Sequence, residues 1–164
     1  MFTRVTGLFI LHFSRILGAI SVDEPFLLVK ADENEPTDVR TIIATVTPAN
    51  ASNKRVTWSS SDETVATVDN NGVVTGITGG TATITVTSVA DTTKKATVYV
   101  VVGDLLVPAG WSIQDVIDDA EAGQVIAVAP AEYKEQLVID KPLTLLGPNA
   151  GIAGDSTDRL GEAT

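Results

Sequence analysis

The chain has 164 residues, and its 21 Asp and Glu against 11 Lys and Arg give a formal net charge of −10. This length suits one ordinary domain, or a small domain followed by part of another, and a surface this acidic repels nucleic acids and anionic membranes. No Cys is present and His12 is the one histidine, so we expect no disulfide, no thiolate or multi-histidine metal site and no Ser-His-Asp triad.

Residues 1–22 have the outline of a secretory signal, with a basic start, an apolar middle and small residues at Gly18–Ser21. His12, Ser14 and Arg15 interrupt the apolar run, and no A-x-A cleavage site follows. The stretch is too short and too interrupted for a membrane-spanning helix. The interpretation is therefore a degenerate signal peptide or an irregular leader, in which His12 is solvated or touches the membrane rather than binding a ligand.

Residues 23–103 alternate apolar and polar side chains with a period of two, which predicts antiparallel strands with one wet, Thr-rich face. Short strands with regular turn signals in a segment of this length are typical of an Ig-like β-sandwich. The apolar positions of the alternation are Ile42, Ala44, Val46, Val56, Trp58, Ala66, Val68, Val74, Ala82, Ile84, Val86, Val98, Val100 and Val102.

Turn residues separate these strands. Asn71-Gly72 can take the positive φ angles of a type I′ hairpin, and Gly79-Gly80 marks the next turn. Pro48 cannot donate to a sheet, so it should end the strand before it. Trp58 is expected to be the large central core residue.

Five motifs follow one another in this segment: "TVTP" before Pro48, then "VTWSSSD", "VATVD", "NGVVTG" and "GTATITV". In this order they resemble the bacterial Ig-like domain of group 2, in the invasin/intimin-like class of surface modules. These motifs cover most of residues 37–102. The first strand, "FLLVKADENEPTDV", departs from the family pattern because it lacks the usual Gly-bearing turn. The resemblance implies an extracellular or cell-surface module that is not generally calcium-dependent.

Ser59–Ser61 have no His or Lys arranged beside them, so we expect their hydroxyls to shape the bend after the Trp58 strand rather than to act as nucleophiles. Asp62, Glu63 and Asp69 could supply oxygen ligands to calcium. Their spacing does not match a calcium loop, and solvated turn acids are commoner.

Two further surface features are weaker signals. Asn50-Ala51-Ser52 fits the glycosylation acceptor pattern, which short sequences match often by chance. Lys94 and Lys95 should decorate a solvent-facing turn.

After Gly103 the pattern changes to a short amphipathic helix. Ile113, Val116, Ile117 and Ala120 form one apolar helical face, with Ser112 as N-cap, Asp115 as a first-turn acid and Gly123 as a stop. Three short strands should follow, at "QVIAVA", "QLVID" and "LTLLG", which together would make one turn of a parallel solenoid.

This segment resembles the first coil of right-handed parallel β-helix proteins of the pectin lyase-like group. Gly123, Ile126, Val128, Pro130 and Tyr133 stand at one set of family positions, and Ile139–Leu145 with Gly147 at a second. In that group the catalytic residues lie on later coils, so none carries over. Glu132, Glu135, Asp140 and Asp155 are candidates by residue type alone, and surface acids are the plainer interpretation.

The sequence therefore predicts an all-β chain: a leader at 1–22, an Ig-like sandwich at 23–103, and a capping helix with an incomplete parallel β-helix coil at 104–164. It predicts no catalytic, cofactor or metal site. The expected function is a non-catalytic spacer or adhesion module of a bacterial or archaeal surface protein. Its partners would be neighbouring domains of a longer chain, and cell-wall or host glycans or surface proteins. The alternative is the N-terminal part of a polysaccharide-active β-helix enzyme, a lyase or esterase, that lacks its catalytic coils.

Overall fold

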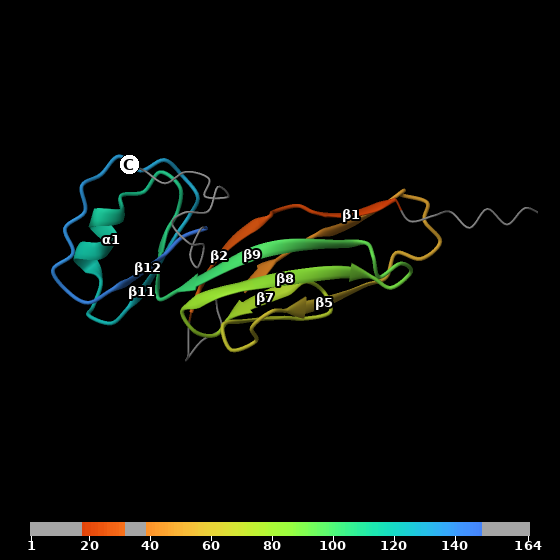
Figure 1. Cartoon of the computed structure of the whole chain (residues 1–164), viewed down its shortest axis with the longest axis horizontal. Coiled ribbons are helices and arrows are strands. Elements are labelled where there is room, and N and C mark those ends of the chain that lie inside the picture. The colour runs from red at the N-terminus through yellow and green to blue at the C-terminus, as the bar shows by residue number, and fades with distance from the viewer. Residues whose placement is uncertain (1–17, 32–38, 149–164) are drawn as a thin grey trace, which may run out of the picture.

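The computed structural model describes residues 18–31 and 39–148, so the predicted signal with His12, and the candidate Asp155, lie outside the described residues. Figure 1 shows an elongated sandwich with a smaller, helix-bearing unit at one end. The strands of the sandwich are β1 Ala19–Val22, β2 Phe26–Lys30, β3 Val39–Thr41, β4 Ala44–Thr47, β5 Val56–Ser60, β6 Ala66–Val68, β7 Val73–Gly76, β8 Gly80–Ser88 and β9 Lys95–Gly103. The smaller unit holds β10 Leu105–Val107, α1 Ile113–Asp119, β11 Val125–Val128 and β12 Thr144–Leu146.

The sandwich packs a four-stranded sheet, in the order β2-β9-β8-β5, against a three-stranded sheet, β3-β7-β6, and a β1–β4 ribbon. Its pairs are antiparallel except β2 with β9, which are parallel. The predicted alternation is confirmed on β8, where Ala82, Ile84 and Val86 are buried and the Thr residues between them are not. The core is almost wholly aliphatic, so packing of β-branched side chains holds the sheets together without a disulfide.

The first strand corrects the predicted edge of the sandwich. Ala19–Val22 form β1 and pair antiparallel with β4, although the sequence pattern places these residues in the leader. Ile20 is buried and packs against Val46 and Val86, and Gly18 N donates to Thr47 O at 2.7 Å. The small residues at the end of the predicted signal therefore lead into a strand, because the apolar Ile20 side chain has a core to enter.

The stretch around Ile42 and Ile43 is two strands rather than one. β3 pairs with β7 and β4 pairs with β1, so the chain crosses between the two packed elements at this point. Ile42 is buried and its N–H donates to Gly72 O at 2.9 Å, whereas Ile43 is 62% exposed and its N–H donates to Asp23 Oδ1 at 2.8 Å. Alternation continues through the crossing, which is why the sequence pattern does not reveal it.

Trp58 is only partly buried, which corrects its expected place as the central core residue. It lies on β5, an edge strand, and packs against both of the aliphatic clusters of the sandwich. A large ring at the edge thus bridges two clusters whose centres are filled by Val and Ile.

The hairpin between β6 and β7 is confirmed, but its turn is not type I′. Gly72 has φ of +81°, while no non-glycine residue in the described part of the chain has a positive φ, so Asn71 cannot occupy the I′ position. The Asp69 carboxylate instead accepts from Asn71 N at 2.8 Å and Val73 N at 2.9 Å, and Gly72 N donates to Asp69 O at 3.1 Å. Hairpin loops longer than two residues commonly combine a right-handed turn with one following residue, usually glycine, in the left-handed region.

The smaller unit is a three-stranded parallel sheet, β10-β11-β12, with α1 packed on it. Ser112 caps α1 and accepts from Asp115 N, and Ile113, Ile117 and Ala120 are buried, as predicted. The helix ends at Asp119, before Gly123. The predicted strand at "QLVID" is wrong: Leu137–Ile139 form no strand and are exposed, and β10 takes a place in the sheet that the sequence pattern did not indicate.

The two units share a tight junction. β9 passes through Asp104 into β10, and Asp104 N donates to Val125 O at 2.8 Å while Val125 N donates to Asp104 Oδ2 at 2.7 Å. A Cβ on Gly79 would stand 2.6 Å from Val125 Cγ2, and one on Gly103 would stand 2.7 Å from Ala127 N. Both glycines therefore let β11 approach the end of the sandwich more closely than any other residue would.

Candidate functional site

The Ser run is a structural feature. Ser60 Oγ accepts from Asp62 N at 3.2 Å, which shapes the bend after β5, as predicted. Ser61 Oγ accepts from Thr83 N at 2.8 Å and so ties the bend to β8. Ser59 is exposed on β5. The Ser60 and Ser61 hydroxyls therefore accept hydrogen bonds from backbone N–H groups and shape the turn.

The acids considered as calcium ligands build turns. Asp62 accepts from Thr64 N at 2.9 Å and from Thr64 Oγ1, and Asp91 makes the same pair of bonds with Thr93. The hydroxyl and N–H bonds from Thr64 and Thr93 lower the pKa of Asp62 and Asp91, and the Val73 N–H lowers that of Asp69, because each favours the ionised carboxylate. Glu63 is exposed beside them. Within residues 18–31 and 39–148 no group of His, Cys, Asp and Glu is arranged to hold a metal ion.

Glu135 has a defined structural task that the sequence did not reveal. Its carboxylate accepts from Ile113 N at 3.1 Å, Gln114 N at 3.1 Å and Ser112 Oγ at 3.0 Å, all at the N-terminus of α1. These groups lower the pKa of Glu135, the Gln114 N–H most and the Ile113 N–H next. A negative charge at a helix N-terminus also complements the helix dipole.

The other end of α1 is held by a cation. Lys141 Nζ donates to Ala120 O at 2.8 Å and to Asp118 O at 3.0 Å, two carbonyls that the helix leaves without partners. Val138 N also donates to Gln114 Oε1 at 2.7 Å, in the first turn of the helix. The irregular segment after β11 therefore holds α1 at both of its ends.

The remaining acids do not form a catalytic group. Glu132 pairs with Lys134 at 3.0 Å, and both side chains are largely exposed. Asp140 is exposed. Glu135 binds the helix N-terminus, and among residues 18–31 and 39–148 no second acid lies with it to serve in acid–base chemistry. Tyr133 packs on the core of the smaller unit and donates to Ala129 O at 3.0 Å, and its partial burial raises its pKa.

The weaker signals lie on the surface. Asn50 is exposed in the turn after Pro48. Lys94 is half-buried in the β8–β9 turn, and Lys95 is the exposed first residue of β9. That turn is organised by the buried Ser88, whose Oγ accepts from Ala90 N and Asp91 N, and nothing in the pattern singled it out.

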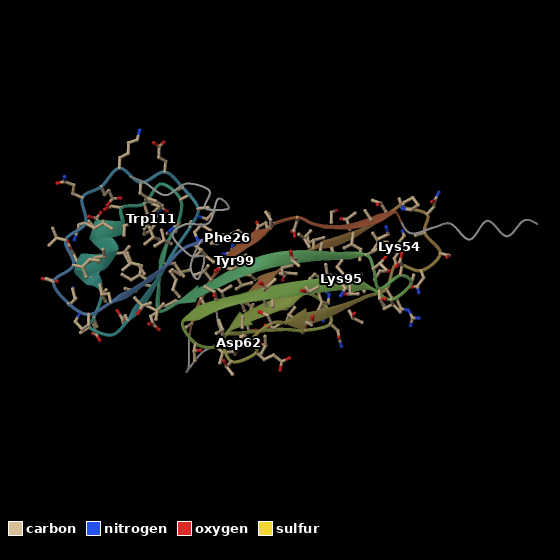
Figure 2. All side chains as sticks on the ribbon, in the orientation of Figure 1. Phe26, Lys54, Asp62, Lys95, Tyr99 and Trp111 are labelled. Atoms are coloured by element: carbon tan, nitrogen blue, oxygen red, sulfur yellow. The ribbon has the colours of Figure 1, made fainter. Side chains whose placement is uncertain are left out.

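The solvent-facing side of the four-stranded sheet carries an aromatic pair. On the outer face of the four-stranded sheet, Phe26 of β2 stacks on Tyr99 of β9, with ring centroids 6.2 Å apart and planes at 29°. Figure 2 shows these two rings beside each other and Lys95 towards the opposite end of β9. Tyr99 is paired with Thr83 of β8, whose neighbours on the same face are also Thr. The sequence carried no distinct signal for this pair, because Leu28 and Val101 follow at the next outward positions of the same two strands and are also apolar.

Residues 20–100 match the family model of the bacterial Ig-like domain (group 2). The match spans the sandwich from β1 into β9, so the Ig-like assignment of this segment is confirmed, and it begins before the predicted boundary at residue 23. Inside the described ranges, no helix is both long and apolar enough to cross a bilayer.

Two curated relatives come from Bifidobacterium longum subsp. longum. One, named 3-O-alpha-D-galactosyl-alpha-L-arabinofuranosidase, is 54% identical over 61 residues, which cover 37% of this chain and 5% of the relative. The other, named alpha-L-arabinofuranosidase, is 48% identical over 73 residues, 44% of this chain and 6% of the relative. The chain thus spans about a twentieth of the length of these relatives.

Among solved structures, domains 1–6 of the surface layer protein SbsC align with a TM-score of 0.43 and 28% identity, covering 53% of this chain and 13% of that one. An intimin mutant of EHEC O157:H7 aligns with a TM-score of 0.39 and 16% identity, covering 63% of this chain and 66% of that one. The assignment of the sandwich rests on the family model and the observed strand order.

Proposed function

We propose that this chain is a non-catalytic module of an extracellular or cell-surface protein, in which the Ig-like sandwich acts as a rigid spacer that orients the parallel unit joined to it. The junction is the observation that supports the proposal most strongly. Asp104 and Val125 exchange hydrogen bonds there, and Gly79 packs against Val125. A flexible linker between the two units would give neither contact.

The absence of a converging acid–base pair among the described acids supports the non-catalytic part. Glu135 holds α1, Glu132 pairs with Lys134, and Asp140 points to solvent away from any partner acid that the structure describes. We expect no cleavage of arabinan, pectin or polygalacturonate above a buffer blank. Turnover that disappeared in Glu135→Gln or Asp140→Asn would overturn this part.

Rigidity has a direct test. Residual dipolar couplings from amides of β8 and of β11 should fit one alignment tensor if the units move as one body. Two tensors of clearly different magnitude or orientation would contradict the spacer role. A Gly-Ser insertion after Asp104 is the matched control, because it should separate the tensors without altering either unit.

A second function has a specific observation in its favour. The strands β10, β11 and β12 pair in parallel register, with successive partners about 20 residues apart in the chain, as in the beginning of a solenoid. We propose on this ground that the smaller unit starts a parallel β-helix within a larger polysaccharide-active protein. The names of the two arabinofuranosidase relatives support the same setting. Partners would then be neighbouring domains of one polypeptide, together with cell-wall or host glycans or surface proteins.

A further inference from the structure

The outer face of the four-stranded sheet has a composition suited to sugar rings. Across the sheet, Phe26, Tyr99 and Thr83 form one row, and Thr97 and Thr85 lie in the next. Phe26, Tyr99, Thr83 and Thr85 are half-exposed and Thr97 is exposed, so rings and hydroxyls are reachable from solvent. The exposed part of the face lies on strands rather than on loops (Figure 1), and it ends before the next row, where Val101 is fully buried.

The charge of this face differs from that of the chain. The chain has 21 acidic residues, yet the outward positions of β2, β5, β8 and β9 hold no Asp or Glu. Two lysines, Lys30 and Lys95, lie at its opposite ends. An uncharged strip bearing hydroxyls and aromatic rings complements an uncharged, hydroxyl-rich partner, whereas the net charge of −10 disfavours a polyanion.

We infer that this outer face, centred on Phe26, Tyr99, Thr83 and Thr85, binds an extended neutral polysaccharide. Sugar rings present C–H groups that stack on aromatic faces, and their hydroxyls exchange hydrogen bonds with Thr hydroxyls. The inference deepens the proposed function and rests on it, since it gives the spacer a ligand. A second copy of the chain fits the face less well, because stable homodimer interfaces are more apolar than a surface rich in Thr.

The full chain should be tested by affinity electrophoresis in gels that contain arabinan, a neutral polysaccharide. Gels that contain polygalacturonate, an acidic polysaccharide, provide the comparison. Arabinan should retard the chain and polygalacturonate should not. Phe26→Ala should weaken retardation about fivefold, as expected for loss of one ring contact. Thr83→Glu should do the same by placing a carboxylate beside the aromatic pair.

Two controls separate the face from other causes. Thr45→Glu adds the same charge on an exposed position of β4, and Trp111→Ala removes a ring that is 62% exposed but lies outside the sheet. Both should bind arabinan as the parent chain does, and circular dichroism should show that all four variants are folded.

Several outcomes would overturn the inference: no retardation by arabinan, retardation by polygalacturonate alone, loss of binding in Thr45→Glu or Trp111→Ala, or a dimer in sedimentation that Thr83→Glu abolishes. A chain that binds no polysaccharide yet fits one alignment tensor would overturn the binding inference and leave the spacer proposal standing.

Discussion

Gly72 lies directly against the indole ring of Trp58. A Cβ on Gly72 would stand 2.9 Å from Trp58 Cζ2 and 2.6 Å from Ile42 O. The same glycine has φ of +81° and accepts the Ile42 N–H, so one residue closes the hairpin, supports the ring and fixes the point where the chain changes sheets.

Gly72→Ala should therefore destabilise the sandwich by about 1–3 kcal/mol, because the methyl group overpacks the site and the left-handed φ is strained. The measurement is urea unfolding. Gly110→Ala is the control: Gly110 has φ of +86° but a Cβ there would meet nothing within 4 Å. Equal losses in the two variants would mean that backbone strain alone matters and that contact with Trp58 does not.

Trp58→Ala should cost about 3 kcal/mol, near the lower end for large aromatic residues because the ring is only partly buried. Trp58→Phe should restore part of this loss by keeping contact with both aliphatic clusters. Thermal unfolding followed by circular dichroism provides the measurement. A loss below about 1 kcal/mol in Trp58→Ala would show that the ring is not part of the core.

A fragment of residues 18–103 should unfold cooperatively and be more stable than a fragment of residues 23–103. The shorter fragment lacks β1, so Val46 and Val86 lose their contact with Ile20 and β4 loses its partner strand. The expected difference is about 2 kcal/mol or more, by analogy with deleting one buried aliphatic side chain. If the two fragments were equally stable in urea, β1 would not be part of the cooperatively folded unit.

A fragment of residues 104–164 should show weak, non-cooperative structure by itself.

Acid should release the segment that grips α1. The pKa of Glu135 is lowered in the folded chain, so the ionised carboxylate stabilises the folded state. This contribution is complete above about pH 4.3, the ordinary Glu value, and is lost as the pH falls through the lower folded pKa. Amide shifts of Ile113 and Gln114 should follow that titration.

Glu135→Gln should abolish the titration at these two amides and speed their hydrogen exchange at neutral pH. Glu132→Gln is the matched control, since Glu132 contacts Lys134 and not the helix. Asp62, Asp69 and Asp91 also have lowered pKa values, so global stability falls in the same acid range and only the local amides distinguish Glu135. An unchanged titration in Glu135→Gln would contradict the assignment.

The junction should behave as a coupled pair. Gly79→Ala should destabilise the chain because its methyl group meets Val125, and Val125→Ala should cost less in the Gly79→Ala background than alone. The coupling energy from a double-mutant cycle in thermal unfolding should be about 0.5 kcal/mol or more. Additive losses would mean that the two units do not pack at this point.

The sequence by itself determined the sandwich and the helix. Period-two alternation on β8, the turn residues near Gly72 and Pro48, and the Ser112 cap of α1 are local signals, and each acts through its own backbone and nearest neighbours. Local patterns of this kind can be recognised from the sequence because they depend on neighbouring residues and not on which distant segment packs against them.

Only the tertiary structure decided the features that join distant segments. Ala19–Val22 become a strand because β4 offers a partner, and "QLVID" is not one because Glu135 and Lys141 hold that segment along α1 instead. Phe26 and Tyr99 meet only because β2 pairs in parallel with β9. These outcomes depend on which segments lie side by side. A hydrophobic pattern indicates which face of a strand or helix is apolar, but it does not indicate which segment packs against that face.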